Sequence, residues 1–193
     1  MGGRPLAELQ LSCILIRLYR QIMTRRFEEL VKKYRDWVYT FAFYSLGNRE
    51  EAEDTTQEVL MRLWDNLENL REASVSAWLR RVTTNACIDT ARKRKAYRTR
   101  VIAGGGVEQL PQAVSRELDP GLSAEGSELR TRIRAAISEL TEPYRSIVIH
   151  REIQGMKYDE ISDAMQLPLN TVKSYLHRAR RTLREQLKEV RNP

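Results

Sequence analysis

The sequence is poor in residues that form covalent cross-links or bind metals. Its 193 residues include two cysteines, Cys13 and Cys87, and two histidines, His150 and His177. Two thiols do not make a disulfide framework, and neither pair has companion residues at the spacing of zinc ligands. We therefore expect reduced thiols in a cytoplasmic protein, with no bound metal and no other cofactor.

Catalytic motifs are also missing. The chain shows no glycine-rich phosphate loop and no recognisable arrangement of a nucleophile with a base. Asp54 and Glu58 lie four residues apart, but two carboxylates alone are weak evidence for a metal site. An enzyme acting on nucleic acid is therefore the least favoured function, and we expect no small-molecule substrate.

No apolar run is long enough to cross a membrane. The apolar stretch near the N-terminus is interrupted by Arg17 and Arg20, is too short to span a bilayer, and has no convincing cleavage site after it. Residues 1–21 are compatible with an amphipathic extra helix, a membrane-surface segment, or sequence upstream of a start at Met23. We favour the first or the third of these and assign the segment no function.

Positive charge and helical patterning, by contrast, are abundant. The net charge is +7 and the sequence pI is about 9.6, which favours a polyanionic partner. Residues 101–128 differ from the rest, with five acidic residues, one basic residue, a Gly104–Gly106 run and two prolines. This is the composition of a linker. We predict an all-α protein with an N-terminal extension (1–21), a helical domain (22–100), a flexible acidic linker (101–127) and a second helical domain (128–193).

Three helices are predicted in the first domain from apolar residues at three- and four-residue spacing. The first covers residues 24–46, with Thr24 as its cap and Gly47-Asn48 at its end. The second covers 49–67, and the third begins near Ser74 and continues into a basic tail that reaches about residue 100. We expect Trp64 and Trp78 to lie in the hydrophobic core rather than to stack on bases.

The second domain ends in a predicted helix–turn–helix. We expect Ser127 to cap its opening helix. Residues 158–165 have an apolar face, Pro168 interrupts the pattern, and Asn170 or Thr171 can cap the helix that follows. That last helix has an apolar stripe and a basic outer face. A helix–turn–helix places such a recognition helix in the DNA major groove. The stripe consists of Val172, Leu176, Ala179 and Leu183.

Two segments of the chain resemble bacterial sigma factors. Residues 51–94 are similar to sigma region 2, through EDTTQE at 53–58, Trp78 and NACID at 85–89. Residues 140–187 are similar to sigma region 4, through TVKS at 171–174 and HRAR at 177–180. Two such regions without a region 3 domain between them are typical of the extracytoplasmic-function (ECF) group of the sigma-70 family. The resemblance implies a transcription initiation factor with no catalytic activity of its own. The alternative is a stand-alone helix–turn–helix regulator.

The resemblance also implies the roles of three sets of residues. A carboxylate and amide face of the second helix would bind core RNA polymerase: Asp54, Gln57, Glu58 and Met61. A loop and the third helix would bind and help to melt the −10 element: Asn69, Leu70, Arg71, Ser74, Arg80, Asn85, Asp89 and Arg92. The recognition helix would read the −35 element through Thr171, Lys173, Ser174, His177, Arg178 and Arg181. Arginine can form paired hydrogen bonds with guanine, and both arginine and lysine can bind phosphates.

The partners implied by the resemblance are all macromolecules. They are promoter DNA, the clamp helices of the largest polymerase subunit, and the flap of the second-largest subunit. An anti-sigma factor that wedges between the two domains is a further expectation. A free or inhibited protein should then hold its domains closer together than the polymerase-bound form does.

Overall fold

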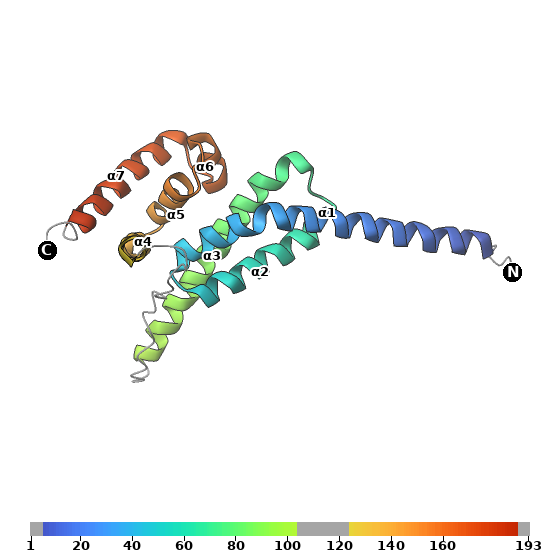
Figure 1. Cartoon of the computed structure of the whole chain (residues 1–193), viewed down its shortest axis with the longest axis horizontal. Coiled ribbons are helices and arrows are strands. Elements are labelled where there is room, and N and C mark those ends of the chain that lie inside the picture. Colours follow the sequence, from blue (N-terminus) through green and yellow to red (C-terminus); the bar gives the residue numbers. More distant parts are fainter. Residues whose placement is uncertain (1–5, 104–123, 189–193) are drawn as a thin grey trace.

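The computed structural model describes residues 6–103 and 124–188, and every element in these ranges is a helix. The predicted all-α architecture with two helical units is confirmed (Figure 1). The first unit contains α1 (Leu6–Leu46), α2 (Arg49–Asn66) and α3 (Glu72–Ala103). The second contains α4 (Ala124–Glu139), α5 (Tyr144–Val148), the π-helix η1 (Ile149–Ile153), α6 (Tyr158–Met165) and α7 (Leu169–Lys188).

Helix α1 is much longer than the sequence pattern suggested. It begins at Leu6 and continues without interruption, so Thr24 lies inside the helix and the prediction that Thr24 caps it was wrong. No glycine or proline occurs between residues 6 and 46, and nothing in that stretch stops a helix. Gly47 ends α1 in the left-handed conformation at a φ of 69°, as expected for a residue without a Cβ.

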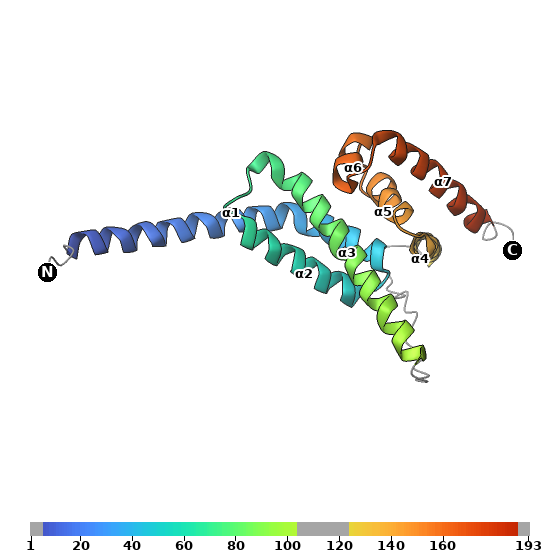
Figure 2. The same cartoon turned by 180° about the vertical axis from the view of Figure 1, so that it is seen from behind.

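The N-terminal part of α1 projects away from the rest of the molecule, as the two opposite views both show (Figures 1 and 2). Within the described residues, no helix is long and apolar enough to cross a membrane. Residues 6–23 are thus helical, as part of α1.

Helices α1, α2 and α3 enclose a hydrophobic core of their own. Val38 from α1, Leu63 from α2 and Leu79 from α3 are completely or almost completely buried in it. Trp78 packs partly against this core, in line with expectation. Trp64 does not: its side chain is 45% exposed, because it lies on the outer side of α2 against the edge of Phe27. The prediction that Trp64 is a core residue was wrong.

The helices extend into the segment predicted to be a linker. Helix α3 reaches Ala103 and α4 begins at Ala124, so both ends of the predicted 101–127 linker are helical. Ser127 lies inside α4, and the prediction that it caps this helix was wrong. The remainder of the predicted linker lies outside the described residues.

The predicted helix–turn–helix is present, but α7 begins earlier than expected. Gln166 ends α6 in the left-handed conformation at a φ of 54°, although it is not a glycine. The Pro168 carbonyl accepts from the amides of Thr171 and Val172, so α7 has already begun at Leu169. Asn170 and Thr171 therefore lie in the first turn, and the prediction that one of them caps α7 was wrong.

The two units pack directly against each other. A second hydrophobic core takes Phe41 and Leu46 from α1 and Cys87 from α3, together with Ile147 and Ile161 from the second unit. Helix α6 packs on α3, while α4 and η1 pack on the C-terminal half of α1 (Figures 1 and 2). Cys87 is a small residue of this hydrophobic core, and burial raises the pKa of its thiol above the usual value.

Candidate nucleic-acid interface

Helix α7 has two opposite faces. Val172, Leu176 and Ala179 are buried against the second unit, and Leu183 packs partly there. The residues predicted to read DNA lie at the positions between the buried ones, and the helical repeat turns their side chains toward the outer face of α7. All are exposed except Thr171, which is half-buried in the first turn. The structure brings the whole predicted set to one side of α7: Thr171, Lys173, Ser174, His177, Arg178 and Arg181.

Arginines on α7 differ in what holds them. Arg180 donates to one carboxylate oxygen of Glu152 through two nitrogens, at 2.9 and 2.7 Å, and this contact raises its pKa. Arg180 is therefore tied to the π-helix of its own unit. Arg178 is exposed and Arg181 has only a loose contact, at 3.9 Å, with Glu185. Lys173, Arg178 and Arg181 are therefore the exposed cations of the predicted set.

One face of α3 gathers three of the eight residues predicted for the −10 element. Asn85, Asp89 and Arg92 are exposed at four- and three-residue spacing, which places them in one row. Asp89 and Arg92 are 3.7 Å apart. Because Asn85 is exposed, it does not serve a buried hydrogen bond. Arg81, four residues before Asn85, is exposed in the same row and was missed by the motif comparison, which had selected its neighbour.

That neighbour, Arg80, lies elsewhere. Its guanidinium is 2.9 Å from the Glu160 carboxylate of α6 in the second unit, and both side chains are largely covered. A one-residue step along a helix turns the side chain by about 100°. The structure therefore does not bring Arg80 to the row formed by Asn85, Asp89 and Arg92.

The loop between α2 and α3, together with the first turn of α3, carries four more predicted −10 residues, of which Ser74 lies in the helix. Asn69, Arg71 and Ser74 are exposed, whereas Leu70 packs partly against the first hydrophobic core. Arg26 of α1 holds this loop: its two terminal nitrogens donate to the carbonyl oxygens of Leu67, at 2.9 Å, and Leu70. Sequence patterns gave no sign of Arg26, because its partners are backbone atoms more than 40 residues away.

Helix α2 presents the face predicted for core polymerase. Asn48 caps the helix by accepting from the Glu51 amide at 2.9 Å, and Ala52, Thr55, Val59 and Leu63 are buried on the inner side. The outer side carries carboxylates, an amide and one thioether, and the Met61 side chain is 68% exposed. The structure brings the predicted set together on this exposed side: Asp54, Gln57, Glu58 and Met61.

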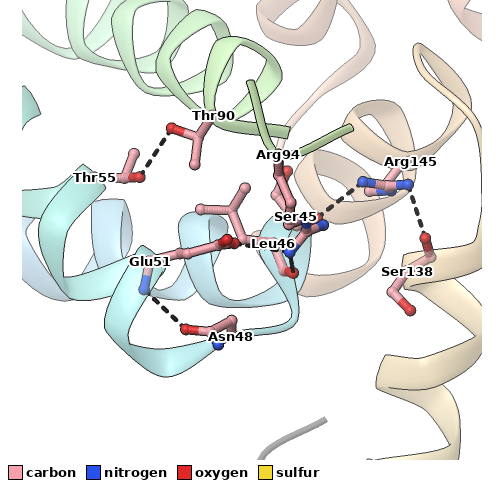
Figure 3. Close-up of polar contacts among 9 residues, drawn as sticks. All are labelled: Ser45, Leu46, Asn48, Glu51, Thr55, Thr90, Arg94, Ser138 and Arg145. Atoms are coloured by element: carbon pink, nitrogen blue, oxygen red, sulfur yellow. Dashed lines mark hydrogen bonds and ion pairs between the residues drawn. The ribbon is translucent and has the colours of Figure 1, made fainter. Parts of the chain in front are cut away.

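A polar junction joins the two units where α1 ends (Figure 3). The last carbonyls of a helix carry a partial negative charge and no intrahelical partner. Arg145 of α5 donates to the Ser45 carbonyl at 3.0 Å, and Arg94 of α3 donates to the Leu46 carbonyl at 3.0 Å and to Glu51 at 2.8 Å. Two arginines thus cap α1, and one of them comes from the second unit.

A buried histidine forms a second polar link between the units. His150 of η1 stacks on Phe41, with ring centroids 4.5 Å apart, and its Nε2 lies 3.0 Å from the Thr84 hydroxyl of α3. Its Nδ1 lies 3.0 Å from Gln154 Oε1, while the Gln154 amide nitrogen donates to the Trp37 carbonyl at 3.0 Å. Because the Gln154 oxygen can only accept, the imidazole donates from Nδ1; the Thr84 hydroxyl at Nε2 also donates to the Arg80 carbonyl at 2.8 Å. Burial, with the nearby charge of Arg80, lowers the pKa of His150 to about 4.

Comparison with known proteins agrees with this geometry. The first unit matches the family Sigma-70 region 2 over residues 30–97, and the second matches Sigma-70, region 4 over residues 130–183. The chain is 33% identical over 168 residues to the ECF RNA polymerase sigma factor SigW of Bacillus subtilis, covering 85% of this chain and 90% of SigW. It is 32% identical over 160 residues to SigE of Mycolicibacterium smegmatis, covering 83% of this chain but only 61% of SigE.

Solved structures share the fold. The sigma factor RpoE, in its complex with the anti-sigma factor NepR from Bartonella quintana, superposes with a TM-score of 0.68 at 24% identity, covering 85% of this chain and 98% of RpoE. CnrH, in complex with the cytosolic domain of CnrY, gives a TM-score of 0.60 at 21% identity, covering 86% of this chain and 90% of CnrH.

A helix–turn–helix unit with an exposed basic recognition face, joined to a three-helix unit that matches region 2, defines a sigma factor of the sigma-70 class. Within that class, the chain belongs to the ECF group of RNA polymerase sigma factors. Proteins of this family are not enzymes, and membership in it decides against the stand-alone regulator.

Proposed function

We propose that this sigma factor binds core RNA polymerase, directs it to specific promoters and helps to melt the −10 element. The observation that carries the proposal is the arrangement of α7: its buried stripe and its basic face lie on opposite sides, and the cations of that face are free to contact DNA. The first unit supplies a separate exposed face on α2. The chain can therefore hold duplex DNA and a protein partner at once.

Within this function the exposed sets take distinct roles. Lys173, Ser174, His177, Arg178 and Arg181 read or hold the −35 duplex from α7. The row on α3, with the loop before it, contacts the −10 element: an extruded base needs a pocket, and the opened strand needs cations along its backbone. Asn85 offers both a donor and an acceptor to a base edge.

The α2 face binds the clamp helices of the largest polymerase subunit. Asp54 and Glu58 supply negative charge to a basic partner surface, and exposed charge pairs favour fast, specific and reversible association. The second unit meets the flap of the second-largest subunit. These contacts place the protein in the cytoplasm, where promoter DNA is transcribed.

An anti-sigma factor controls access to these faces. The proteins that share the fold, RpoE and CnrH, were each solved in complex with a partner, which is named as an anti-sigma factor in the case of RpoE. The direct packing of the two units here supports a compact inactive state, since Arg80 of α3 is bound to Glu160 and is not available to DNA. An inhibitor that stabilises this packing would keep the two units from binding the −10 and −35 elements at the same time.

Run-off transcription with core polymerase and a library of genomic promoter fragments tests the function. Polymerase with the purified chain should start at a restricted set of promoters, and polymerase alone should not. If the chain neither associates with core polymerase nor changes where transcription starts, the proposed function is wrong.

A further inference from the structure

Exposed large apolar side chains gather at one end of the first unit. Tyr19 is 49% exposed, Met61 68% and Trp64 45%. They belong to the projecting part of α1 and to the C-terminal half of α2. Apolar groups clustered in this way on a surface mark an interaction site more often than single exposed ones do.

A groove lies between these two helices. Tyr19, Arg20, Met23 and Thr24 line it from α1, and the end of α2 lines it with Trp64, Asp65, Leu67 and Glu68. Its walls are fixed to each other. The nearby Glu68 carboxylate raises the pKa of Tyr19, and the rings of Phe27 and Trp64 meet edge to face with centroids 5.1 Å apart.

The groove continues the exposed face of α2. Residues three, four and seven positions apart share one side of a helix. From Met61 the same side therefore leads to Trp64, Asp65 and Glu68, with no buried residue between them on that side. The acidic character of the face also continues, because the α2 wall of the groove carries Asp65 and Glu68. The groove is thus contiguous with the face formed by Asp54, Gln57, Glu58 and Met61.

We propose that the projecting part of α1 enlarges the docking surface for core polymerase, and that this groove takes the end of the same helical partner that binds the α2 face. The partner segment is a helix with an apolar seam and basic flanks: the seam fits Tyr19, Met23 and Trp64, and the flanks face Asp65 and Glu68. This inference rests on the proposed function, because it extends the polymerase contact assigned there.

Binding of the full chain to core polymerase, measured by fluorescence anisotropy, tests the groove. Tyr19→Ala should raise Kd about fivefold to tenfold, the effect of removing an aromatic anchor from an interface. Tyr19→Phe should bind almost as well as the wild type, since it keeps the apolar ring. Gln21→Ala is the matched control: it lies on the same exposed helix but points away from the groove, and its Kd should not change. Thermal unfolding should be the same for all, because Tyr19 is not part of a hydrophobic core.

The outcomes separate this inference from the function on which it rests. If the wild type binds core polymerase and Asp54→Arg weakens binding while Tyr19→Ala does not, the groove proposal is wrong and the function stands. If the wild type does not bind at all, both fail. If Tyr19→Ala instead abolishes dimerisation, or binding to vesicles of anionic lipid, with the polymerase Kd unchanged, the surface serves a second copy or a membrane and the proposal is overturned.

Discussion

At the scale of single residues, position around a helix decides what an arginine does. Arg178 and Arg180 are two positions apart on α7, yet one is exposed on the outer face and the other is bound to Glu152. A bound arginine that leaves its carboxylate for DNA loses one charged contact to gain another. Arg178 has no such loss, so it is the stronger candidate for the −35 contact.

Charge reversal at this position should weaken promoter binding. Arg178→Glu is expected to cost about 1–3 kcal/mol in the binding of −35 duplex DNA by the polymerase-bound chain. Affinity for core polymerase should not change, because Arg178 lies far from the α2 face. Arg132→Glu, the same charge change at an exposed site of α4, is the control. Equal loss of DNA affinity in the two variants would mean that net charge, and not the α7 face, governs binding.

A second residue, His150, should make the compact form sensitive to pH. The pKa of His150 is about 4 in the buried site, against about 6.5 in water. Above pH 6.5 the imidazole is neutral in both the compact and the unfolded chain, so its burial does not make stability depend on pH there. As pH falls from 6.5 toward 4, the open or unfolded chain takes up a proton that the compact form does not, and the compact form loses about 1.4 kcal/mol of stability per pH unit.

Urea unfolding at pH 7.5 and at pH 5.5 measures this effect. The free energy of unfolding of the wild type should be about 1 kcal/mol lower at pH 5.5 than at pH 7.5, because pH 5.5 lies one unit below the usual histidine pKa. His150→Gln has no proton to gain there, and its free energy of unfolding should change less over the same interval. An identical change in both proteins would show that other groups carry the pH dependence.

At the scale of helices, the apolar periodicity was enough to predict which elements exist and which face of each is buried. The stripes on α6 and α7 are buried as predicted, because repeated burial at three- and four-residue spacing leaves a clear pattern. Helix ends were predicted less well. Thr24 and Ser127 are good capping residues, but both lie inside helices: no glycine or proline precedes Thr24 in α1, and α4 continues through Gly126.

The residues that the sequence could not reveal are those whose partners are far away in the chain. Arg26 holds backbone carbonyls of the α2–α3 loop, and Arg145 caps α1 from another unit. Neither contact leaves a local pattern. The separation of Arg80 from Arg81 could not be predicted for a related reason: periodicity places both on an amphipathic helix, but only tertiary packing decides which one Glu160 binds.

Helix α2 allows a test of the polymerase contact. Asp54→Arg should weaken binding to core polymerase by roughly tenfold, about 1.4 kcal/mol, because it places a cation against a basic partner. Binding of −35 duplex DNA should be spared. Asp36→Arg, the same change at an exposed site of α1, should leave polymerase binding intact in the same titration. If both variants bind as the wild type does, the α2 face is not the contact.

At the scale of the whole molecule, the two units form a single packed body in which one hydrophobic core is shared. Phe41 and Ile147 are both completely buried in that core although they belong to different units. Polar links also cross the same boundary, among them Arg145 with Ser45, His150 with Thr84, Gln154 with Trp37, and Arg80 with Glu160. Separating the units breaks all of these contacts together.

Separation on polymerase binding can be measured directly. Spin labels at exposed Lys32 of α1 and Asp163 of α6, in a chain with Cys13 replaced by serine, should report one short distance in the free protein. The buried Cys87 should not react with the label. Adding core polymerase should replace the short distance with a longer one. Equal distances in the free and bound states would rule out opening.

The shared hydrophobic core has a consequence for every affinity measured with this protein. A partner that binds only the separated arrangement must first supply the free energy that holds the units together. The observed free energy of binding is therefore weaker than that of the contact itself by the cost of separating the units. Weakening the boundary, for example with Glu160→Gln, should therefore tighten association with polymerase without adding any contact to it. The same substitution should lower the affinity of an inhibitor that binds the closed arrangement.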